Sequence, residues 1–406
     1  MPFLSATFDN LSIVITMQSR YFNYTTYHAT HGWEYRRFLQ KWRQIYATDS
    51  RWPPLHYRQQ ALLRYSQKSR HLARLDLSFI YLEALPQRKT VGAMGGILWE
   101  EAVAAAIVAI DPRVTDGSGQ LILLHCANDE ESLDRLLGIA LEELARRGRY
   151  RLVGPIGPSP HLHCGSLTNY FHVMPPLHTP YNPPYIPELL ASSMMPWQNL
   201  GLTRVSLAPP QDGKATVDPT ATFATRLREL QTNPRLAQVE FRPLTAALAT
   251  SEQLLSLWQV ASPVREFFPM PDRLEIEFLW QWITVWPWAG GVIFVADQPA
   301  GFVLLQPDLA IPNRVASGGK NPLWNWWLRW RVNRPVISGR LVYGGVSAQW
   351  QDYGIADLLW QWTVEYAQTQ GWHSITVGPH PMTDFPFNGA ALNGEMQQRY
   401  TVYSFG

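Results

Sequence analysis

The sequence LVYGGVSAQWQDYGIA, residues 341–356, joins an apolar strand to the beginning of a helix. Its first part, Leu341–Val346, has the β-branched and aromatic side chains of a strand, and its last part, Gln351–Ala356, is a turn with small residues. A helix-like segment from Asp357 to Gln370 follows, and a second apolar strand ends at Val377-Gly378-Pro379. This order predicts a strand–helix–strand unit whose turn directs backbone N–H groups towards an anion.

A partial copy of this unit lies in the N-terminal half. Residues 121–155 repeat the strand, a helix ended by Gly148, and a strand that closes on Val153-Gly154-Pro155. Where the turn belongs, this copy reads HCANDEE, residues 125–131, with three carboxylates and no glycine. Carboxylates at a helix N-terminus stabilise the helix themselves and repel a pyrophosphate. We therefore expect only the C-terminal copy to bind a phosphorylated cofactor.

The length of the chain and the repeated unit predict two tandem domains. At 406 residues the chain is long for one domain, and both halves show the order strand, helices, hairpin, strand, helix, strand. A polar stretch with proline and glycine, Pro209–Pro219, separates them. We place an N-terminal domain at residues 1–208, a linker with a connecting helix at 209–232, and a C-terminal domain at 233–406.

Periodicity and β-propensity predict the individual elements. In the N-terminal half, the expected strands are residues 12–17, 78–82, 91–98, 121–125, 151–154 and 203–207, and the expected helices are 33–46 and 133–146, the second capped by Asp129 or Ser132. In the C-terminal half, the expected strands are residues 238–242, 292–296, 300–305, 340–346 and the one ending at 377–379, and the expected helices are 252–260, 272–285 and 357–370.

Composition and charge exclude several classes of protein. A net charge of +2 provides no basic face of the kind that nucleic-acid binding requires, so we expect no nucleic-acid partner. Two cysteines, Cys126 and Cys164, cannot build the disulfide framework of a small secreted protein. A run of about 20 uncharged apolar residues is missing, which argues against a membrane span, and the N-terminus lacks the pattern of a signal peptide. We expect a cytoplasmic protein.

The turn resembles the acyl-coenzyme A binding motif of the GCN5-related N-acetyltransferase (GNAT) superfamily. That motif is Gln/Arg-x-x-Gly-x-Gly/Ala, and residues 351–356 fit it. The resemblance implies two tandem α/β (α+β) domains, each a mixed, mostly antiparallel sheet flanked by helices, with acetyl-CoA as co-substrate and no metal. It also implies that the strand backbone aligns the pantetheine arm and that the turn holds the pyrophosphate. The residues concerned are Gly345 and Val346 on the strand and Gln351, Asp352, Tyr353, Gly354, Ile355 and Ala356 in the turn.

Residues 393–405 resemble a further feature of the superfamily. This feature is the pattern Asn-x-x-Ala-x-x-x-Tyr-x-x-x-Gly-Phe, which many members carry on the helix after the fifth strand. Asn393, Tyr400 and Phe405 meet the spacing, whereas Met396 replaces the alanine and Ser404 the first glycine. The resemblance implies that Asn393 contacts the pantetheine arm. It also implies that Tyr400 is the catalytic residue, a general acid that protonates the leaving thiolate. Since the sequence stops soon afterwards, we expect the last strand of the superfamily to be missing or contributed from elsewhere.

The N-terminal half resembles a divergent branch of the same superfamily, found in bacterial proteins of undefined function. The residues that carry this resemblance are Val153-Gly154-Pro155, Cys164-Gly165-Ser166-Leu167 and Tyr181-Asn182-Pro183-Pro184-Tyr185. It implies a degenerate N-terminal copy that shapes the acceptor site or serves as a scaffold.

Together these features predict an N-acetyltransferase that moves an acyl group from acetyl-CoA to a primary amine of a small molecule or peptide, in the C-terminal domain. The amine attacks the thioester directly, without a covalent enzyme intermediate. The base that deprotonates the amine stays open among four carboxylates, Glu266, Asp272, Glu275 and Glu277. Two alternatives also stay open: a non-catalytic interaction or coenzyme A-sensing protein, and a transferase of related fold that uses aminoacyl-tRNA to build peptide bonds.

The segment Pro155–Pro187 is irregular and rich in proline, which indicates a functional or rigidly packed loop. It holds His161, His163 and Cys164, which suggest a metal site, but a second pair of ligands is missing from the sequence. Cys164 as a nucleophile would need a neighbouring histidine as its base. We expect ordinary loop residues here. For Tyr181–Tyr185 we expect a rigid turn that packs two rings on the core, with the wall of a substrate cleft as the alternative.

Tryptophan is unusually frequent, with 18 in the chain. Several lie in Trp280–Trp288 and several in WNWWLRWR, residues 324–331, within the insertion at 321–331. Such an aromatic and basic cluster marks a membrane interface, a ligand groove, or a helix that packs its rings on the domain while Arg329 and Arg331 extend to water. We expect the packed helix.

Overall fold

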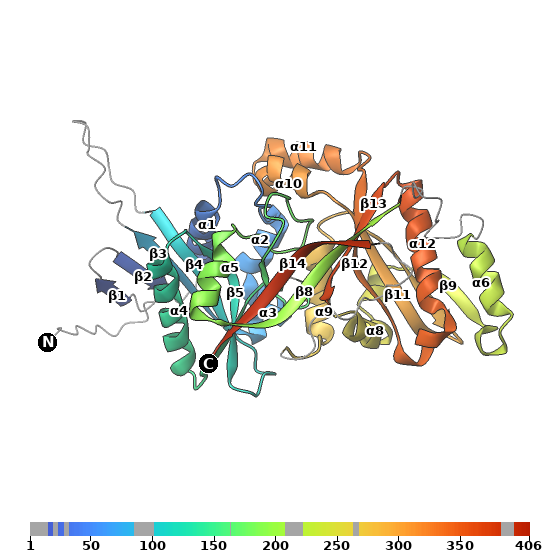
Figure 1. Ribbon diagram of the computed structural model, residues 1–406, viewed down its shortest axis with the longest axis horizontal. Coiled ribbons are helices and arrows are strands. Elements are labelled where there is room, and N and C mark those ends of the chain that lie inside the picture. The colour runs from blue at the N-terminus through green and yellow to red at the C-terminus, as the bar shows by residue number, and fades with distance from the viewer. Residues whose placement is uncertain are drawn as a thin grey trace.

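One 14-stranded sheet runs through the whole protein in the computed structural model (Figure 1). The structure describes residues 15–18, 23–27, 32–84, 101–162, 164–207, 222–262, 268–382 and 394–406. The two halves of the chain lie at opposite ends of the long axis, and two long strands cross the middle.

The N-terminal half supplies eight strands and five α-helices within its described residues. The strands are β1 (Ile15–Gln18), β2 (Asn23–Tyr27), β3 (Asp76–Ala84), β4 (Glu101–Ile110), β5 (Ser118–Cys126), β6 (Arg151–Ile156), β7 (Ser166–Leu167) and β8 (Met195–Ser206). The helices are α1 (Gly32–Ile45), α2 (Tyr57–Arg64), α3 (Arg70–Arg74), α4 (Glu130–Ala145) and α5 (Tyr185–Ser193). Every residue from Ala104 to Ala109 of β4 is at most 2% exposed, because α1 and α4 pack on this strand.

The C-terminal half follows the helix α6 (Phe223–Gln231). Its strands are β9 (Val239–Pro243), β10 (Ala289–Val295), β11 (Gln298–Pro307), β12 (Ser338–Val346), β13 (Ser374–Pro381) and β14 (Gly394–Phe405). Its helices are α7 (Ala246–Ala249), α8 (Leu255–Ala261), α9 (Arg273–Ile283), α10 (Ala310–Val315), α11 (Pro322–Val332) and α12 (Ile355–Thr369).

The two halves repeat one topology, as the sequence predicted. In each, three antiparallel strands are followed by a helix and a strand parallel to the third. The N-terminal set is β3, β4, β5, α4 and β6, and the C-terminal set is β10, β11, β12, α12 and β13. The Val-Gly-Pro sequences occupy equivalent places in β6 and β13, and both Gly–Pro bonds are cis. The predicted mixed, mostly antiparallel sheet with flanking helices is confirmed.

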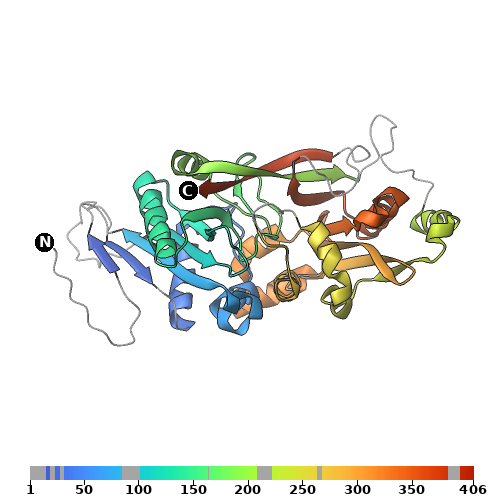
Figure 2. The ribbon, with the colours of Figure 1, turned by 90° about the horizontal axis from the view of Figure 1, so that it is seen from below.

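The halves exchange their last strands. β8, from the N-terminal half, pairs antiparallel with β13, where Ser206 faces Ser374. β14, from the C-terminal half, pairs antiparallel with β6, where Tyr403 faces Gly154. β8 and β14 also pair with each other along most of their length and form the centre of the sheet (Figures 1 and 2). Each half therefore completes its sheet with a strand from the other.

The structure corrects the prediction for the end of the chain. Residues 394–405 form the strand β14, so the helix predicted to carry Tyr400 is wrong. Gln398 and Tyr400 are buried while Arg399 between them is exposed, which is the period of two that a strand requires. The expected strand at residues 91–98 lies outside the described residues.

Among the described residues, no helix combines the length and hydrophobicity that crossing a bilayer requires.

Candidate functional site

The turn predicted to bind pyrophosphate lies at the N-terminus of α12. β12 ends at Val346, a 3₁₀ turn occupies Ala348–Tyr353, and α12 starts at Ile355. Gly354 has φ 76°, in the left-handed region that residues with a Cβ seldom adopt. A Cβ built there would meet one described atom within 4 Å, Leu230 Cδ2 at 3.5 Å. The backbone therefore requires glycine, and the space beside it is open.

The two equivalent helix N-termini differ in their caps. In α4, the Asp129 carboxylate accepts hydrogen bonds from the backbone N–H of Ser132, at 2.9 Å, and from its hydroxyl. In α12, no side chain of the described residues caps the terminus. The first N–H groups of a helix have no acceptor within the helix. The Ile355 and Ala356 N–H groups of α12 are therefore available to bind an anion. At the N-terminus of α4, the Asp129 carboxylate already occupies the equivalent position.

Side chains beside the turn add further donors. The Trp350 indole nitrogen is buried and has no hydrogen-bond partner among the described residues. Arg235 donates to the Tyr353 hydroxyl, and its guanidinium lies 5.9 Å from the centre of that ring. Gln351 and Asp352 are exposed. A buried N–H without an acceptor and a nearby cation fit a phosphate group at this turn.

β12 and β13 diverge in front of the turn and form a fork. They pair in parallel only over residues 338–341 and 374–377, whereas β12 continues to Val346. Beyond the branching point, the edge of β12 that faces away from β11 has no strand beside it in the part of the chain that the structure describes. Gly345 lies on this open part, and a Cβ there would be 3.2 Å from the backbone nitrogen of Ala261 on α8. The missing side chain lets α8 pack directly on the strand.

The proline-rich segment of the N-terminal half lies over this fork. Arg340 donates to the carbonyl oxygen of Gly378 at 2.7 Å and to that of Leu177. The Tyr343 hydroxyl donates to the carbonyl oxygen of His161 at 2.9 Å. Both His161 and Leu177 belong to the proline-rich segment, so the N-terminal half contributes a wall to the fork of the C-terminal half.

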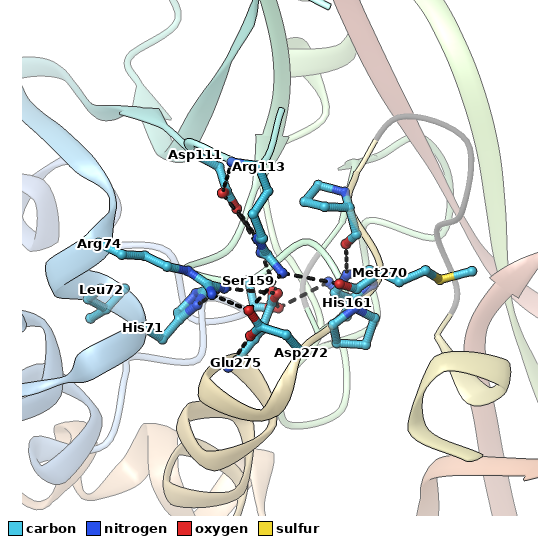
Figure 3. Close-up of polar contacts among 12 residues, drawn as sticks. His71, Leu72, Arg74, Asp111, Arg113, Ser159, His161, Met270, Asp272 and Glu275 are labelled. Carbon is cyan, nitrogen blue, oxygen red and sulfur yellow. Dashed lines mark hydrogen bonds and ion pairs between the residues drawn. The ribbon is translucent and has the colours of Figure 1, made fainter. Parts of the chain in front are cut away.

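A buried cluster of charges joins the two halves next to this wall (Figure 3). Glu275 of α9 is fully buried and accepts hydrogen bonds from Arg113 Nη2 at 2.7 Å and from Ser159 Oγ at 2.8 Å. Arg74 of α3 forms ion pairs with Asp272 and, at 3.7 Å, with Glu275. Because Asp272 and Glu275 meet arginines of the N-terminal half, the cluster joins one half to the other.

The four carboxylates considered as a base have different surroundings. Glu266 lies outside the described residues. Asp272 caps α9 by accepting from the Glu275 N–H at 3.0 Å. Glu277 accepts from Arg273 at 3.1 Å, and its side chain is 28% exposed.

Glu275 remains ionised inside the protein. Burial alone would raise its pKa, but the charges of His161, His71 and Arg113 outweigh burial and hold the pKa below its usual range. Burial lowers the pKa of both histidines, so the cations beside Glu275 at neutral pH are Arg113 and Arg74. A fully buried carboxylate with a lowered pKa is a weak base for an external amine, and its contacts indicate a structural role.

Tyr400 lies near the fork, on the central strand β14. It is fully buried, and its hydroxyl donates to Gln398 Oε1 at 3.2 Å. Burial raises the pKa of Tyr400, and the Thr179 side chain and the Arg340 guanidinium lower it by less. The phenol is therefore protonated at neutral pH. Asn393 lies outside the described residues.

Two solved structures share this architecture. A tandem GNAT protein from the clavulanic acid biosynthesis pathway aligns with 94% of this chain and 97% of its own, at a TM-score of 0.51 and 11% identity. The chain has the tandem GCN5-related N-acetyltransferase fold. A GCN5-related glucosamine N-acetyltransferase region of a fungal multi-domain GH3 β-N-acetylglucosaminidase aligns with 97% of this chain and 38% of that chain, at a TM-score of 0.51 and 12% identity. No protein-family model and no curated protein matches the sequence.

The N-terminal copy of the GNAT fold has its own fork, between β5 and β6, and this fork holds a cavity of ≈ 80 Å³. Trp42, Trp52, His125 and Tyr181 are among its lining residues. The His125 ring stacks on Trp42 with ring centres 4.0 Å apart, and burial lowers the pKa of His125 to about 3. The cavity is thus aromatic and uncharged around a neutral histidine. Tyr181 and Tyr185 pack on the core, as expected, and Tyr181 also lines this cavity.

The cysteine and histidine of the proline-rich segment have structural contacts. Cys164 is a buried free thiol, and burial raises its pKa, so the nucleophilic thiolate is disfavoured. His161 Nε2 lies 3.0 Å from the carbonyl oxygen of Pro269, and His163 is outside the described residues. In the parts of the chain that the structure covers, no three His, Cys, Asp or Glu side chains are grouped to hold a metal ion.

Three residues of this candidate site were not predicted from the sequence. Arg340 could have been noticed in the sequence, because it is a charged residue at the start of an otherwise apolar stretch. In the structure its side chain is only 2% exposed. Trp350 and Arg235 could not have been noticed in this way, since their place beside the turn depends on how the 3₁₀ turn and the segment after α6 pack.

Proposed function

We propose that the C-terminal half transfers an acetyl group from acetyl-CoA to a primary amine. One observation carries this proposal: α12 has an uncapped N-terminus behind a left-handed glycine, at the open end of a fork between parallel strands. The GNAT fold of both halves supports it. The aromatic fork of the N-terminal half lacks the same phosphate-binding turn, because Asp129 fills its helix terminus.

The residues present fit an acyl-coenzyme A ligand. The turn Gln351–Ala356 would hold the pyrophosphate through backbone N–H groups, with Trp350 and Arg235 as further donors. The open edge of β12 at Gly345 and Val346 would align the pantetheine arm by strand-like hydrogen bonds. When bound, acetyl-CoA supplies an activated thioester. The proline-rich wall from the N-terminal half would bound the acceptor side.

The binding part of the proposal is tested with purified full-length protein. Acetyl-CoA and CoA at millimolar concentration should raise the thermal midpoint, because a ligand that binds only the folded state stabilises it by mass action. Pantetheine, which lacks the pyrophosphate, should raise it far less. An unchanged midpoint with acetyl-CoA would overturn the proposal.

The catalytic part is tested by release of the free thiol with a panel of primary amines. Thiol release that depends on the amine supports acyl transfer. Binding of acetyl-CoA without thiol release for any amine would instead identify a coenzyme A-sensing protein, the non-catalytic alternative.

Tyr400 is proposed as the group that protonates the departing thiolate. Its phenol is protonated at neutral pH and lies close enough to Arg340, in the fork, for that cation to lower its pKa. Tyr400→Phe should lower kcat by about 10²-fold or more while KM stays similar, since general acids contribute on this scale.

The matched control is Tyr403→Phe on the same strand. Tyr403 is also buried, and its hydroxyl donates to the Pro187 carbonyl oxygen at 3.4 Å. Equal kcat values for wild type and Tyr400→Phe would show that the Tyr400 hydroxyl only serves packing.

A further inference from the structure

The tryptophan-rich helix α11 turns an apolar face to solvent. Residues spaced i, i+3, i+4 and i+7 share one face of a helix, and in a soluble protein such a face normally covers the core. In α11 these positions are Leu323, Trp326, Trp327 and Trp330. Leu323 is 69% exposed, Trp326 65% and Trp330 47%, whereas the buried residue is Leu328. The expectation of a helix that packs its rings on the domain is wrong for this face.

Neighbouring residues enlarge the exposed apolar area. α10 packs against α11 at one edge of the molecule (Figure 1). On α10, Ile311 is 67% exposed and Val315 is 50% exposed. Ile337, beyond the end of α11, is 69% exposed. So many large apolar side chains in one insertion indicate a surface that meets an apolar medium or partner.

The same insertion carries only positive charges. Between residues 309 and 339 the sequence has Arg314, Lys320, Arg329, Arg331 and Arg334 and no aspartate or glutamate, although the whole chain has a net charge of only +2. The Arg334 guanidinium lies 4.6 Å from the centre of the Trp330 ring. Aromatic and cationic side chains thus share one surface, which is complementary to a partner that is both apolar and anionic.

A basic groove adjoins this surface. It has a volume of ≈ 490 Å³, and Arg36, Arg43, Arg64 and Lys320 line it with no carboxylate among its described lining residues. The Arg64 Nε–H is buried and has no hydrogen-bond partner among the described residues. Burial and the cations Arg43 and Arg36 lower the pKa of Lys320. Four cations that line one groove, without a carboxylate among the described lining residues, form a site for an anion such as a phosphate group.

The groove and the apolar face are continuous. Tyr57 lines the groove, and the Arg329 and Asn325 side chains of α11 lie close enough to its hydroxyl to help lower its pKa against the effect of burial. A Cβ at Gly319 would lie 3.5 Å from the Tyr57 ring. Lys320, which lines the groove, directly precedes the N-cap of α11.

We propose that α11 and the basic groove bind the surface of a bilayer that contains anionic lipid. Leu323, Trp326 and Trp330 insert among the headgroups and upper acyl chains, as tryptophan and leucine of interfacial helices do. The arginines beside them attract the anionic surface, and a headgroup phosphate occupies the groove. A nucleic acid would satisfy the cations, but it would leave the exposed leucine and isoleucines in water, so the bilayer accounts for more of the surface.

The experiment is flotation of the full-length protein with vesicles. Vesicles of phosphatidylcholine with about 30% phosphatidylglycerol should bind the protein at least about tenfold more tightly than vesicles of pure phosphatidylcholine, because anionic lipid attracts basic segments. Trp326→Ser combined with Trp330→Ser should weaken binding about tenfold or more, because the interfacial side chains are lost. Lys320→Glu combined with Arg36→Glu should remove the preference for phosphatidylglycerol.

The control variants are Met195→Ser and Tyr150→Ser, which replace side chains that are 76% and 70% exposed on other elements. They should bind the vesicles as the wild type does. All variants should keep the wild-type thermal midpoint, since the residues changed are exposed. The proposal is overturned if the protein does not float with phosphatidylglycerol vesicles at low salt. It is equally overturned if the tryptophan variant floats as the wild type does, or if single-stranded RNA binds while the vesicles do not.

Discussion

Gly354→Glu should weaken binding of acetyl-CoA by at least about 100-fold, since loss of charge-assisted hydrogen bonds to an anion and a new like-charge repulsion each cost a factor of ten or more. The new side chain would stand at the uncapped N-terminus of α12, where the pyrophosphate is proposed to lie. It would cap the helix as Asp129 caps α4, so the C-terminal turn would come to resemble the N-terminal one. Calorimetric titration with acetyl-CoA measures the effect.

The same helix provides the control. Gly371 follows α12, has φ 71°, and a Cβ there would meet no described atom within 4 Å. Gly371→Glu therefore imposes a similar backbone strain of about 1 kcal/mol at the opposite end of the helix. It should leave acetyl-CoA binding unchanged, as should Asp129→Ala in the N-terminal half. Equal affinities of the Gly354 and Gly371 variants would show that the ligand does not use this turn.

Glu275→Gln should destabilise the protein by about 3–5 kcal/mol, the usual effect of removing one partner from a buried ion pair. The amide would take from Arg113 Nη2 one of the two carboxylates that it meets at 2.7 Å and leave it with Asp111, and Arg74 would keep Asp272. Urea unfolding monitored by tryptophan fluorescence measures the change. Because the cluster joins the two halves, we expect the variant to unfold in more than one step.

Glu277→Gln is the matched control, since it lies two residues along the same helix. Its ion pair with Arg273 is partly exposed, with side-chain exposures of 28% and 62%, so its removal should change stability by less than about 1 kcal/mol. Similar losses for the two variants would contradict the role of the buried cluster.

The pH dependence of stability should follow from Glu275. The folded protein holds the pKa of this carboxyl below its usual range, so its contribution is complete above the unfolded-state pKa of about 4.3 and is lost as the pH falls through the lower folded-state value. Wild type should therefore lose stability steeply below about pH 4, and Glu275→Gln should lose less over the same interval. Unfolding curves at several acidic pH values measure the difference.

The local units of this fold could be predicted from the sequence. The strand 341–346, the turn with Gly354 and the following helix are encoded by β-branched residues, a left-handed glycine and helical periodicity, all of which act within a few residues. The cap of α4 could be narrowed to Asp129 or Ser132, and in the structure Asp129 accepts from the backbone N–H of Ser132. These contacts are local, so they depend little on the rest of the chain.

The assembly of the units could not be predicted in the same way. The sequences of β8 and β14 do not show which strand each will pair with, because backbone hydrogen bonds between strands are the same for every sequence. The spacing of Asn393 and Tyr400 favoured a helix by resemblance, and the alternation of buried Gln398 and Tyr400 with exposed Arg399 becomes visible only in the folded protein. The ion pairs of Glu275 also escaped prediction, since Arg113 and Arg74 approach it only when the halves meet.

The exchange of β8 and β14 has a consequence for biosynthesis. When the ribosome has finished the N-terminal half, β6 still lacks its partner β14, because β14 follows the other strands of the C-terminal half in the sequence and is translated after them. This sheet edge stays unpaired in the nascent chain while the C-terminal half is synthesised. Unpaired edge strands can form hydrogen bonds with strands of other chains. Neither half can reach its native sheet as a separate fragment, so we expect the protein to mature as a unit only after the C-terminal strand has left the ribosome.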